Sequence, residues 1–167
     1  AQRFVHYRAE AGSLYARYDT IESEVSRALE LARKHTDPMA MRDEFYQFYS
    51  GGDYFNYGQS QANEIVAKGL AVFAITKGDP REAILTAVNF GRDTDCLAAV
   101  AGGLAGALSG AAALPTEWIA QVNEATRQDR YTNNARTIEE TAEGLHAAFL
   151  ARQRRLGNYL RLMSQTG

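Results

Sequence analysis

Residues 96–114 form an uncharged run, CLAAVAGGLAGALSGAAAL, built almost entirely of alanine, glycine and leucine. Gly102, Gly106 and Gly110 fall four positions apart, so on a helix they form one stripe without side chains. Each glycine in a helix interior costs up to about 1 kcal/mol relative to alanine, which a close approach by another backbone has to offset. The run therefore predicts a buried helix at the centre of a helical protein.

The same run is just long enough to be compared with a membrane-spanning helix. Its hydrophobicity comes from only a few large aliphatic side chains, because alanine and glycine contribute little transfer energy into lipid. Acidic residues precede the run and Pro115-Thr116-Glu117 follows it, with no basic flank on either side. We therefore expect a central helix of a soluble protein that has no membrane partner.

Two acidic residues lie directly before this run, in the segment 89–96, NFGRDTDC. On a regular helix Asp93 and Asp95 would point about 200° apart, so their carboxylates converge only if the backbone leaves the helix there. Gly91 permits such a turn, and Asp95 can cap the following helix. Two carboxylates at a helix entrance suit a hard divalent cation. On spacing alone, a capped helix start with one spare surface acid is a slightly better interpretation.

The acidic segment and the run together resemble the signature of the ADP-ribosylglycohydrolase superfamily, which includes dinitrogenase-reductase-activating glycohydrolases and J1-type crystallins. Weaker family-like stretches on both sides extend the resemblance over residues 60–148. The positions that match the signature are Asn89, Gly91, Asp93, Thr94, Asp95, Ala98, Ala99, Gly102, Gly106, Ala107, Gly110, Pro115 and Trp118.

The resemblance implies an all-α, orthogonal helical domain with a central buried Gly/Ala-rich helix. It also implies a magnesium site, often with two ions, at the mouth of a cleft. Asp93 and Asp95 match the metal-binding carboxylates of the family, and Cys96 stands where threonine or serine usually supplies a third oxygen. Thiolate is a soft ligand, whereas Mg²⁺ requires oxygen donors. Either Cys96 packs as a small apolar group and one metal is held less well, or this branch uses a different metal set. The expected cofactor is Mg²⁺, with Mn²⁺ as the alternative.

Two further family patterns, Gly-Asp-Ala-x-Gly and Thr-Asp-Asp-Thr, complete the metal site from the N-terminal half of family members. Neither pattern occurs in this sequence. We therefore expect residues 1–167 to be the C-terminal part of a single ADP-ribosylglycohydrolase-like domain, with the N-terminal half as a partner. The chain alone is then expected to be inactive.

The leading functional hypothesis is a metal-dependent hydrolase that cleaves a ribosyl glycosidic bond in small-molecule or protein-linked ADP-ribose. Asp93 and Asp95 are its candidate catalytic residues, acting with Cys96 as the candidate metal ligands. The first alternative is a crystallin-like or ADP-ribose-binding member that has lost its chemistry. The second alternative is a hydrolase of another ribosyl N-glycoside.

The candidate substrate-binding residues are Gly91, Arg92, Tyr54 and Tyr57. An arginine beside a metal cleft can hold a phosphate through two hydrogen bonds, and an ordinary solvated arginine fits the sequence equally well. The two tyrosines belong to an aromatic, Gly-flanked loop whose rings could stack on adenine. A hydrophobic lid over the core is the simpler interpretation of that loop.

Bulk composition excludes several partners. The net charge of −2, with both signs mixed along the chain, gives no electrostatic case for binding nucleic acid. Cys96 is the single cysteine, so an intrachain disulfide cannot form, and a reducing, cytoplasmic location is expected.

Capping patterns set the expected helix starts, and no alternating strand pattern occurs. The inward-facing residues expected on the two helices before the acidic segment are Ile65, Val66, Leu70 and Phe73, then Ile84, Leu85 and Val88. The expected helix starts lie at Asp19, Asp37-Pro38, Ser60, Asp79-Pro80, Pro115 and Thr137.

Overall fold

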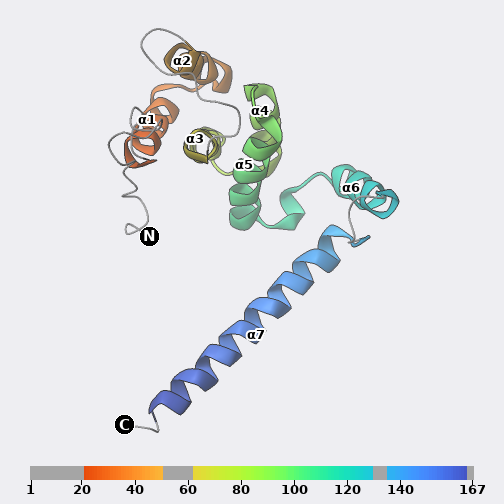
Figure 1. The fold of residues 1–167 in the computed structure, drawn as a ribbon. Helices are drawn as coiled ribbons and strands as arrows, with labels where there is room; N and C mark the ends of the chain where they lie inside the picture. Colours follow the sequence, from red (N-terminus) through yellow and green to blue (C-terminus); the bar gives the residue numbers. More distant parts are fainter. Residues whose placement is uncertain (1–20, 51–61, 130–134, 165–167) are drawn as a thin grey trace. The chain divides into compact units, whose positions relative to one another are not determined.

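The computed structural model describes residues 21–50, 62–129 and 135–164, and these residues are all helical or connecting segments, with no strand among them. The all-α prediction is confirmed. The chain divides into two compact units, Ala1–Leu114 and Pro115–Gly167. The elements are α1 (Ile21–Lys34), α2 (Pro38–Ser50), α3 (Ala62–Ile75), α4 (Pro80–Phe90), α5 (Thr94–Ser109), the 3₁₀ turn η2 (Ala111–Ala113), α6 (Thr116–Gln128) and α7 (Ile138–Ser164) (Figure 1).

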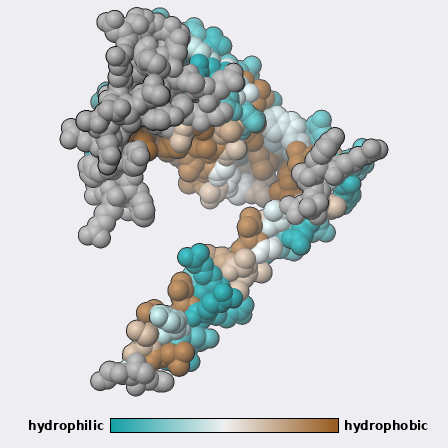
Figure 2. Space-filling view, viewed as in Figure 1, coloured by the Kyte–Doolittle hydropathy of each residue, from teal (hydrophilic) through white to brown (hydrophobic). Residues whose placement is uncertain are grey.

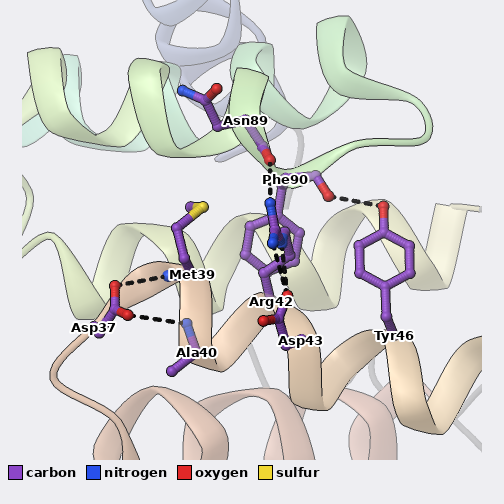
Figure 3. A network of polar contacts seen from close by, with 8 residues as sticks. All are labelled: Asp37, Met39, Ala40, Arg42, Asp43, Tyr46, Asn89 and Phe90. Carbon is purple, nitrogen blue, oxygen red and sulfur yellow. Dashed lines mark hydrogen bonds and ion pairs between the residues drawn. The ribbon is translucent and has the colours of Figure 1, made fainter.

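Local capping explains where several helices begin. At α2, the Asp37 carboxylate accepts hydrogen bonds from the backbone N–H groups of Met39, at 3.0 Å, and Ala40, at 3.3 Å (Figure 3). At α4, the Asp79 carboxylate accepts the N–H of Glu82 at 2.8 Å, and Pro80 is the first helical residue. Both starts were predicted, because an Asp-Pro pair supplies a cap and a fixed backbone angle within two residues.

The predicted capping box at α7 is also confirmed. The N–H of Thr137 donates to the Glu140 carboxylate at 2.7 Å, and the N–H of Glu140 donates to the Thr137 hydroxyl at 3.1 Å. Within the same unit, the Asn123 side chain on α6 accepts the N–H of Ile138 at 2.9 Å, which ties the two helices together. The predicted caps at Asp19 and Ser60 lie outside the described residues.

The core of the unit Ala1–Leu114 is unusually rich in alanine. α3 packs against both α1 and α5, and α4 packs along α5 (Figure 1). Phe45 of α2 and Phe90 of α4 meet edge to face, with ring centroids 5.6 Å apart. Small side chains at many of the other core positions let the helices approach closely. The fully buried alanines are Ala28, Ala67, Ala71, Ala83, Ala87, Ala101 and Ala105.

Helix α5 is buried along one face rather than on all sides. Leu97, Ala101 and Ala105 are buried against the rest of the unit, whereas Leu104 and Leu108 are exposed. One face of α5 is therefore buried among the described residues of this unit, and a place for this helix at the centre of the whole domain stays a prediction. No helix in the described ranges combines the length and the hydrophobicity needed to cross a lipid bilayer.

The glycine stripe on α5 serves close packing at only one of its three positions. A Cβ at Gly102 would lie 2.8 Å from Cγ1 of Ile84, so the helices α4 and α5 need a glycine there. Among the described residues, no atom lies within 4 Å of a Cβ built at Gly106, and Gly110 ends the helix with a φ of 78°. In this part of the chain, the close approach that the sequence predicted for the stripe is therefore found at Gly102 and not at the other two glycines.

Two of the side chains predicted to face inward on α3 and α4 are exposed, whereas Ile65 is buried as predicted. Val66 and Val88 are exposed, although both were expected to point inward. In α3 the buried face carries Glu64 and Lys68, which are only 2% exposed and form an ion pair with each other. A charged pair can replace an apolar contact on a buried face when each charge has a partner.

The long helix α7 exposes many large hydrophobic side chains, as Figure 2 shows along its surface. Between α6 and α7 lies a mainly apolar hollow of about 650 Å³. Its lining residues are Val122, Ala125, Thr126, Asp129, Arg136, Ile138, Thr141, Ala142 and Leu145.

Candidate metal centre

The turn between α4 and α5 has an unusual backbone. Gly91 and Arg92 adopt positive φ angles of 86° and 61°. Glycine tolerates this region freely, whereas a residue with a Cβ pays roughly 1–2 kcal/mol to enter the left-handed conformation. Asp93 follows at the N-cap position of α5, with φ −81° and ψ 74°. The chain thus leaves the helical conformation before Asp93, as the sequence predicted.

The turn brings three candidate metal ligands together. One ligand atom from each of Asp93, Asp95 and Cys96 lies within 4.8 Å of the others. Asp93 is half-buried, and the other two residues are exposed. The cap position differs from the prediction, because Asp93 occupies it and Asp95 lies in the first helical turn.

The Cys96 thiol lies against these carboxylates. Its pKa is raised, first by its hydrogen bond to the Asp93 carboxylate and then by desolvation and the negative charges of Asp93 and Asp95. A proton held on the thiol opposes metal coordination, because the thiolate is the form that binds metals. The two carboxylates, by contrast, are hard oxygen donors that fit Mg²⁺ or Mn²⁺.

The Arg92 side chain forms an ion pair with Glu64, a buried acid on α3. Its Nε and Nη2 atoms donate to the two carboxylate oxygens of Glu64 at 2.7 and 3.2 Å. Nζ of Lys68 donates to Oε1 of the same carboxylate at 2.5 Å. Burial lowers the pKa of Lys68, and the hydrogen bond and charge of Glu64 oppose this shift. One buried carboxylate therefore links two cationic side chains behind the turn.

Tyr46 of α2 closes the other side of the turn. Its hydroxyl donates to the backbone carbonyl oxygen of Phe90 at 2.7 Å (Figure 3), and a Cβ at Gly91 would clash with this hydroxyl. Lys68 Nζ lies 5.3 Å from the centre of the Tyr46 ring and 5.9 Å from that of Phe90, within the range of cation–π attraction. The pKa of Tyr46 is raised, mainly because burial desolvates its phenol group.

An open hollow of about 520 Å³ lies next to this turn. Arg42 lines it and donates to the carboxylate of Asp43 at 2.7 and 2.9 Å and to the carbonyl oxygen of Asn89 at 3.4 Å (Figure 3). Since Gly91 lines the hollow, a ligand bound there would reach the turn that carries Asp93. The lining residues are Arg42, Asp43, Tyr46, Gln47, Asn89, Phe90 and Gly91.

The candidate site residues from the sequence fall into three groups. Asp93, Asp95 and Cys96 lie together, and Gly91 lines the adjoining hollow. Arg92 faces α3, where Glu64 holds its guanidinium group. The remaining two candidates, Tyr54 and Tyr57, lie outside the described residues.

Sequence reasoning missed Glu64, Lys68 and Tyr46. A signal for the first two was present, because they are the only charged residues in the apolar helix ANEIVAKGLAVFAI and lie four positions apart. That spacing allows an acid and a base to pair on one helix face. No comparable local signal marks Tyr46, whose partner lies 44 positions away.

Comparison with protein families gives a match to the ADP-ribosylglycohydrolase family model over residues 4–155. Comparisons with curated proteins and with solved structures give no match. The family match extends beyond residues 60–148, the range of the resemblance found in the sequence, and it includes α1, α2 and the first two-thirds of α7. The chain therefore belongs to the ADP-ribosylglycohydrolase family.

Proposed function

We propose that this protein is a metal-dependent glycohydrolase that cleaves the ribosyl glycosidic bond of an ADP-ribosyl group. The main support is that carboxylate oxygens of Asp93 and Asp95 lie within 4.8 Å of each other at the start of α5, in a chain of this family. Both acids lie at the N-terminal end of α5, where the helix dipole favours negative charge. Two carboxylate oxygen donors at this spacing support the binding of a hard cation.

The donor set fits Mg²⁺ or Mn²⁺, with Asp93 and Asp95 holding the ion and Cys96 beside them as a neutral thiol. A bound Mg²⁺ would orient the ribose hydroxyls and acidify a water molecule. We assign the exposed Asp95 the role of accepting a proton from such a water. The half-buried Asp93 follows directly on Arg92, which Glu64 binds.

The substrate is small-molecule or protein-linked ADP-ribose. The hollow beside Gly91 offers a phenol, a guanidinium group and backbone oxygens to a polar ligand. Since Glu64 already holds Arg92, a phosphate would have to share this guanidinium with the acid. Tyr54 and Tyr57 stay predicted substrate contacts.

The Gly-Asp-Ala-x-Gly and Thr-Asp-Asp-Thr patterns of the family do not occur in these 167 residues. We therefore propose that residues 1–167 are the C-terminal part of one domain, and that acids outside this sequence complete the metal shell. Cys96 stands where family members usually have an oxygen donor. This difference favours a second candidate function, that of an ADP-ribose-binding or crystallin-like member without catalysis.

Paramagnetic broadening by Mn²⁺ tests the metal site, because it detects weak binding. We expect Mn²⁺ to broaden the amide NMR signals of residues 93–96 first, and Mg²⁺ to reverse the effect. Asp93→Asn and Asp95→Asn should each weaken this binding by about tenfold or more, since each removes a charged donor. The matched control is Glu117→Gln, which removes an exposed acid from the first turn of α6. Equal losses in all three variants would show that the cation binds without a specific site.

Catalysis is tested with ADP-ribosyl-arginine peptides and Mg²⁺, using the protein produced from the complete reading frame. Release of ADP-ribose that disappears in Asp95→Asn supports the hydrolase. Tight ADP-ribose binding without any release supports the second candidate.

A further inference from the structure

We propose that Glu64 is a positioning residue of the candidate metal centre: it anchors the Arg92 side chain and so fixes the turn that presents Asp93 and Asp95. This inference deepens the proposed function and rests on it for the metal. Glu64 itself touches neither carboxylate in the pairs described above; it acts through Arg92.

The anchor is a two-point contact between distant parts of the chain. Glu64 lies 28 positions before Arg92, on α3, and its side chain is only 3% exposed. Both carboxylate oxygens accept from the guanidinium group, at 2.7 and 3.2 Å. Such a paired geometry fixes both the position and the plane of the guanidinium group, which a single hydrogen bond cannot do.

The turn needs an anchor because of its backbone. Arg92 has a φ of 61°, a conformation that residues with a Cβ rarely adopt. It immediately precedes Asp93, whose carbonyl oxygen accepts the first helical hydrogen bond of α5, from Leu97 at 3.2 Å. If the Arg92 side chain were released, its backbone could relax toward a negative φ. That rotation would move Asp93 away from Asp95.

The charges of the cluster explain why Glu64 can hold Arg92. Lys68 also pairs with Glu64 and is itself buried, so the acid has a cationic partner independent of the turn. Hydrogen bonds from both cationic side chains hold the buried Glu64 carboxylate in place. Lys68 contributes to packing under the Tyr46 and Phe90 rings, whereas Arg92 extends the cluster to the metal-binding turn.

The test is a double-mutant cycle with two readouts. The four proteins are the wild type, Glu64→Gln, Arg92→Gly and the double variant. The first readout is hydrogen–deuterium exchange of residues 90–97 without metal, and the second is Mn²⁺ affinity from NMR broadening. We expect Glu64→Gln to speed exchange in this segment and to weaken Mn²⁺ binding by roughly tenfold, as loss of outer-shell support does. In the Arg92→Gly background, Glu64→Gln should change neither quantity, because glycine adopts a positive φ without an anchor.

The control is Lys68→Met, which removes the other partner of Glu64 and leaves its pair with Arg92 in place. It should lower the melting temperature while keeping Mn²⁺ affinity within about twofold of the wild type, since no group next to the metal changes. If Glu64→Gln fails to fold, Glu64→Asp retains the charge, shortens its reach and enters the same cycle.

The outcomes separate the two proposals. Equal effects of Glu64→Gln in both backgrounds, or no effect in the wild-type background, would overturn the positioning role. A wild type that binds no Mn²⁺ at Asp93 and Asp95 would overturn the proposed metal site. In that case the hydrogen–deuterium exchange of residues 90–97 would still test the positioning role. The role is supported if Glu64→Gln speeds this exchange only when Arg92 is present.

Discussion

The Tyr46 hydroxyl donates a 2.7 Å hydrogen bond to the carbonyl oxygen of Phe90, the last residue of α4. This contact joins the middle of α2 to the point where the chain leaves α4 and enters the turn before Asp93. The carbonyl group at a helix end has no partner within the helix, so a side chain that reaches it both satisfies the oxygen and fixes the exit of the chain.

Replacing Tyr46 by phenylalanine should therefore destabilise the protein by about 1 kcal/mol, because the ring remains and one partly buried hydrogen bond is lost. Chemical denaturation measures this change. The matched control is Tyr159→Phe on α7, where the tyrosine side chain is 60% exposed and its hydroxyl can bond to water. Similar losses in the two variants would show that the contact with Phe90 contributes nothing specific.

The stability of the wild type should rise with pH over the range just below pH 10. Burial lowers the pKa of Lys68 in the folded state from its usual 10.5, so the unfolded chain binds more protons between the folded and unfolded values. In that window a rise in pH removes the cost of burying the charged amine. Above pH 10 the raised pKa of Tyr46 acts in the opposite direction, because the folded state then retains the phenolic proton.

Urea unfolding of the wild type and Lys68→Met at several pH values measures this contribution. The difference in unfolding free energy between the two proteins should shift in favour of the wild type as pH increases toward 10. The groups that face Lys68 are Glu64, Arg92 and Tyr46, and all three are unchanged in the variant. A pH-independent difference would contradict burial as the cause of the lowered pKa.

At the candidate metal centre, Cys96→Thr should preserve or tighten Mg²⁺ binding, because it places an oxygen beside the two carboxylates. Asp95→Asn should weaken binding by about tenfold or more, because it removes a charged donor. Calorimetric titration of Mg²⁺ into the complete protein compares the three forms. Loss of binding in Cys96→Thr with normal binding in Asp95→Asn would reverse the assignment of the ligands.

The 167-residue chain by itself should hydrolyse ADP-ribosyl substrates negligibly, even in excess Mg²⁺, because two carboxylates are too few for the site that the family resemblance implies. The assay is release of ADP-ribose from a modified arginine peptide over several hours. Steady multiple turnover by this chain would show that its own residues complete the site.

Two glycines should respond in opposite ways to alanine. A Cβ at Gly69 would lie 2.5 Å from Cγ1 of Val100, a stiff β-branched side chain, so Gly69→Ala should destabilise by roughly 1–3 kcal/mol. No atom of the described residues lies within 4 Å of a Cβ at Gly103, so Gly103→Ala should stabilise by about 0.5–1 kcal/mol through helix propensity. Thermal unfolding of the two variants gives the sign of each change.

The parts of the fold that follow from neighbouring residues could be predicted from the sequence. Asp37, Asp79 and Thr137 cap helices through hydrogen bonds that span two or three positions, so their effect is visible locally. The convergence of Asp93 and Asp95 was predictable for a similar reason, because Gly91 permits the necessary break.

The buried faces depended on contacts that no local pattern reveals. Val66 and Val88 are exposed because alanines, rather than the larger side chains, occupy the contacts between helices. The cap at Asp93 in place of Asp95 follows from a second positive φ, at Arg92, which sequence rules do not expect of arginine. That conformation is accompanied by an ion pair with Glu64, whose position in the sequence is remote.

The alanine-rich core has a consequence for the evolution of this chain. At a site such as Ala71 or Ala101, which has no exposed surface, a larger side chain would force two helices apart and a glycine would loosen the helix. At a core position occupied by leucine or valine, a change in side-chain volume can be compensated by a substitution at a neighbouring position. An alanine has only a methyl group, so it leaves almost no volume for such compensation. Substitution should therefore be slow along the contacts of α3, α4 and α5 and faster on their outer surfaces. Distant relatives would then be recognised by where their smallest residues fall.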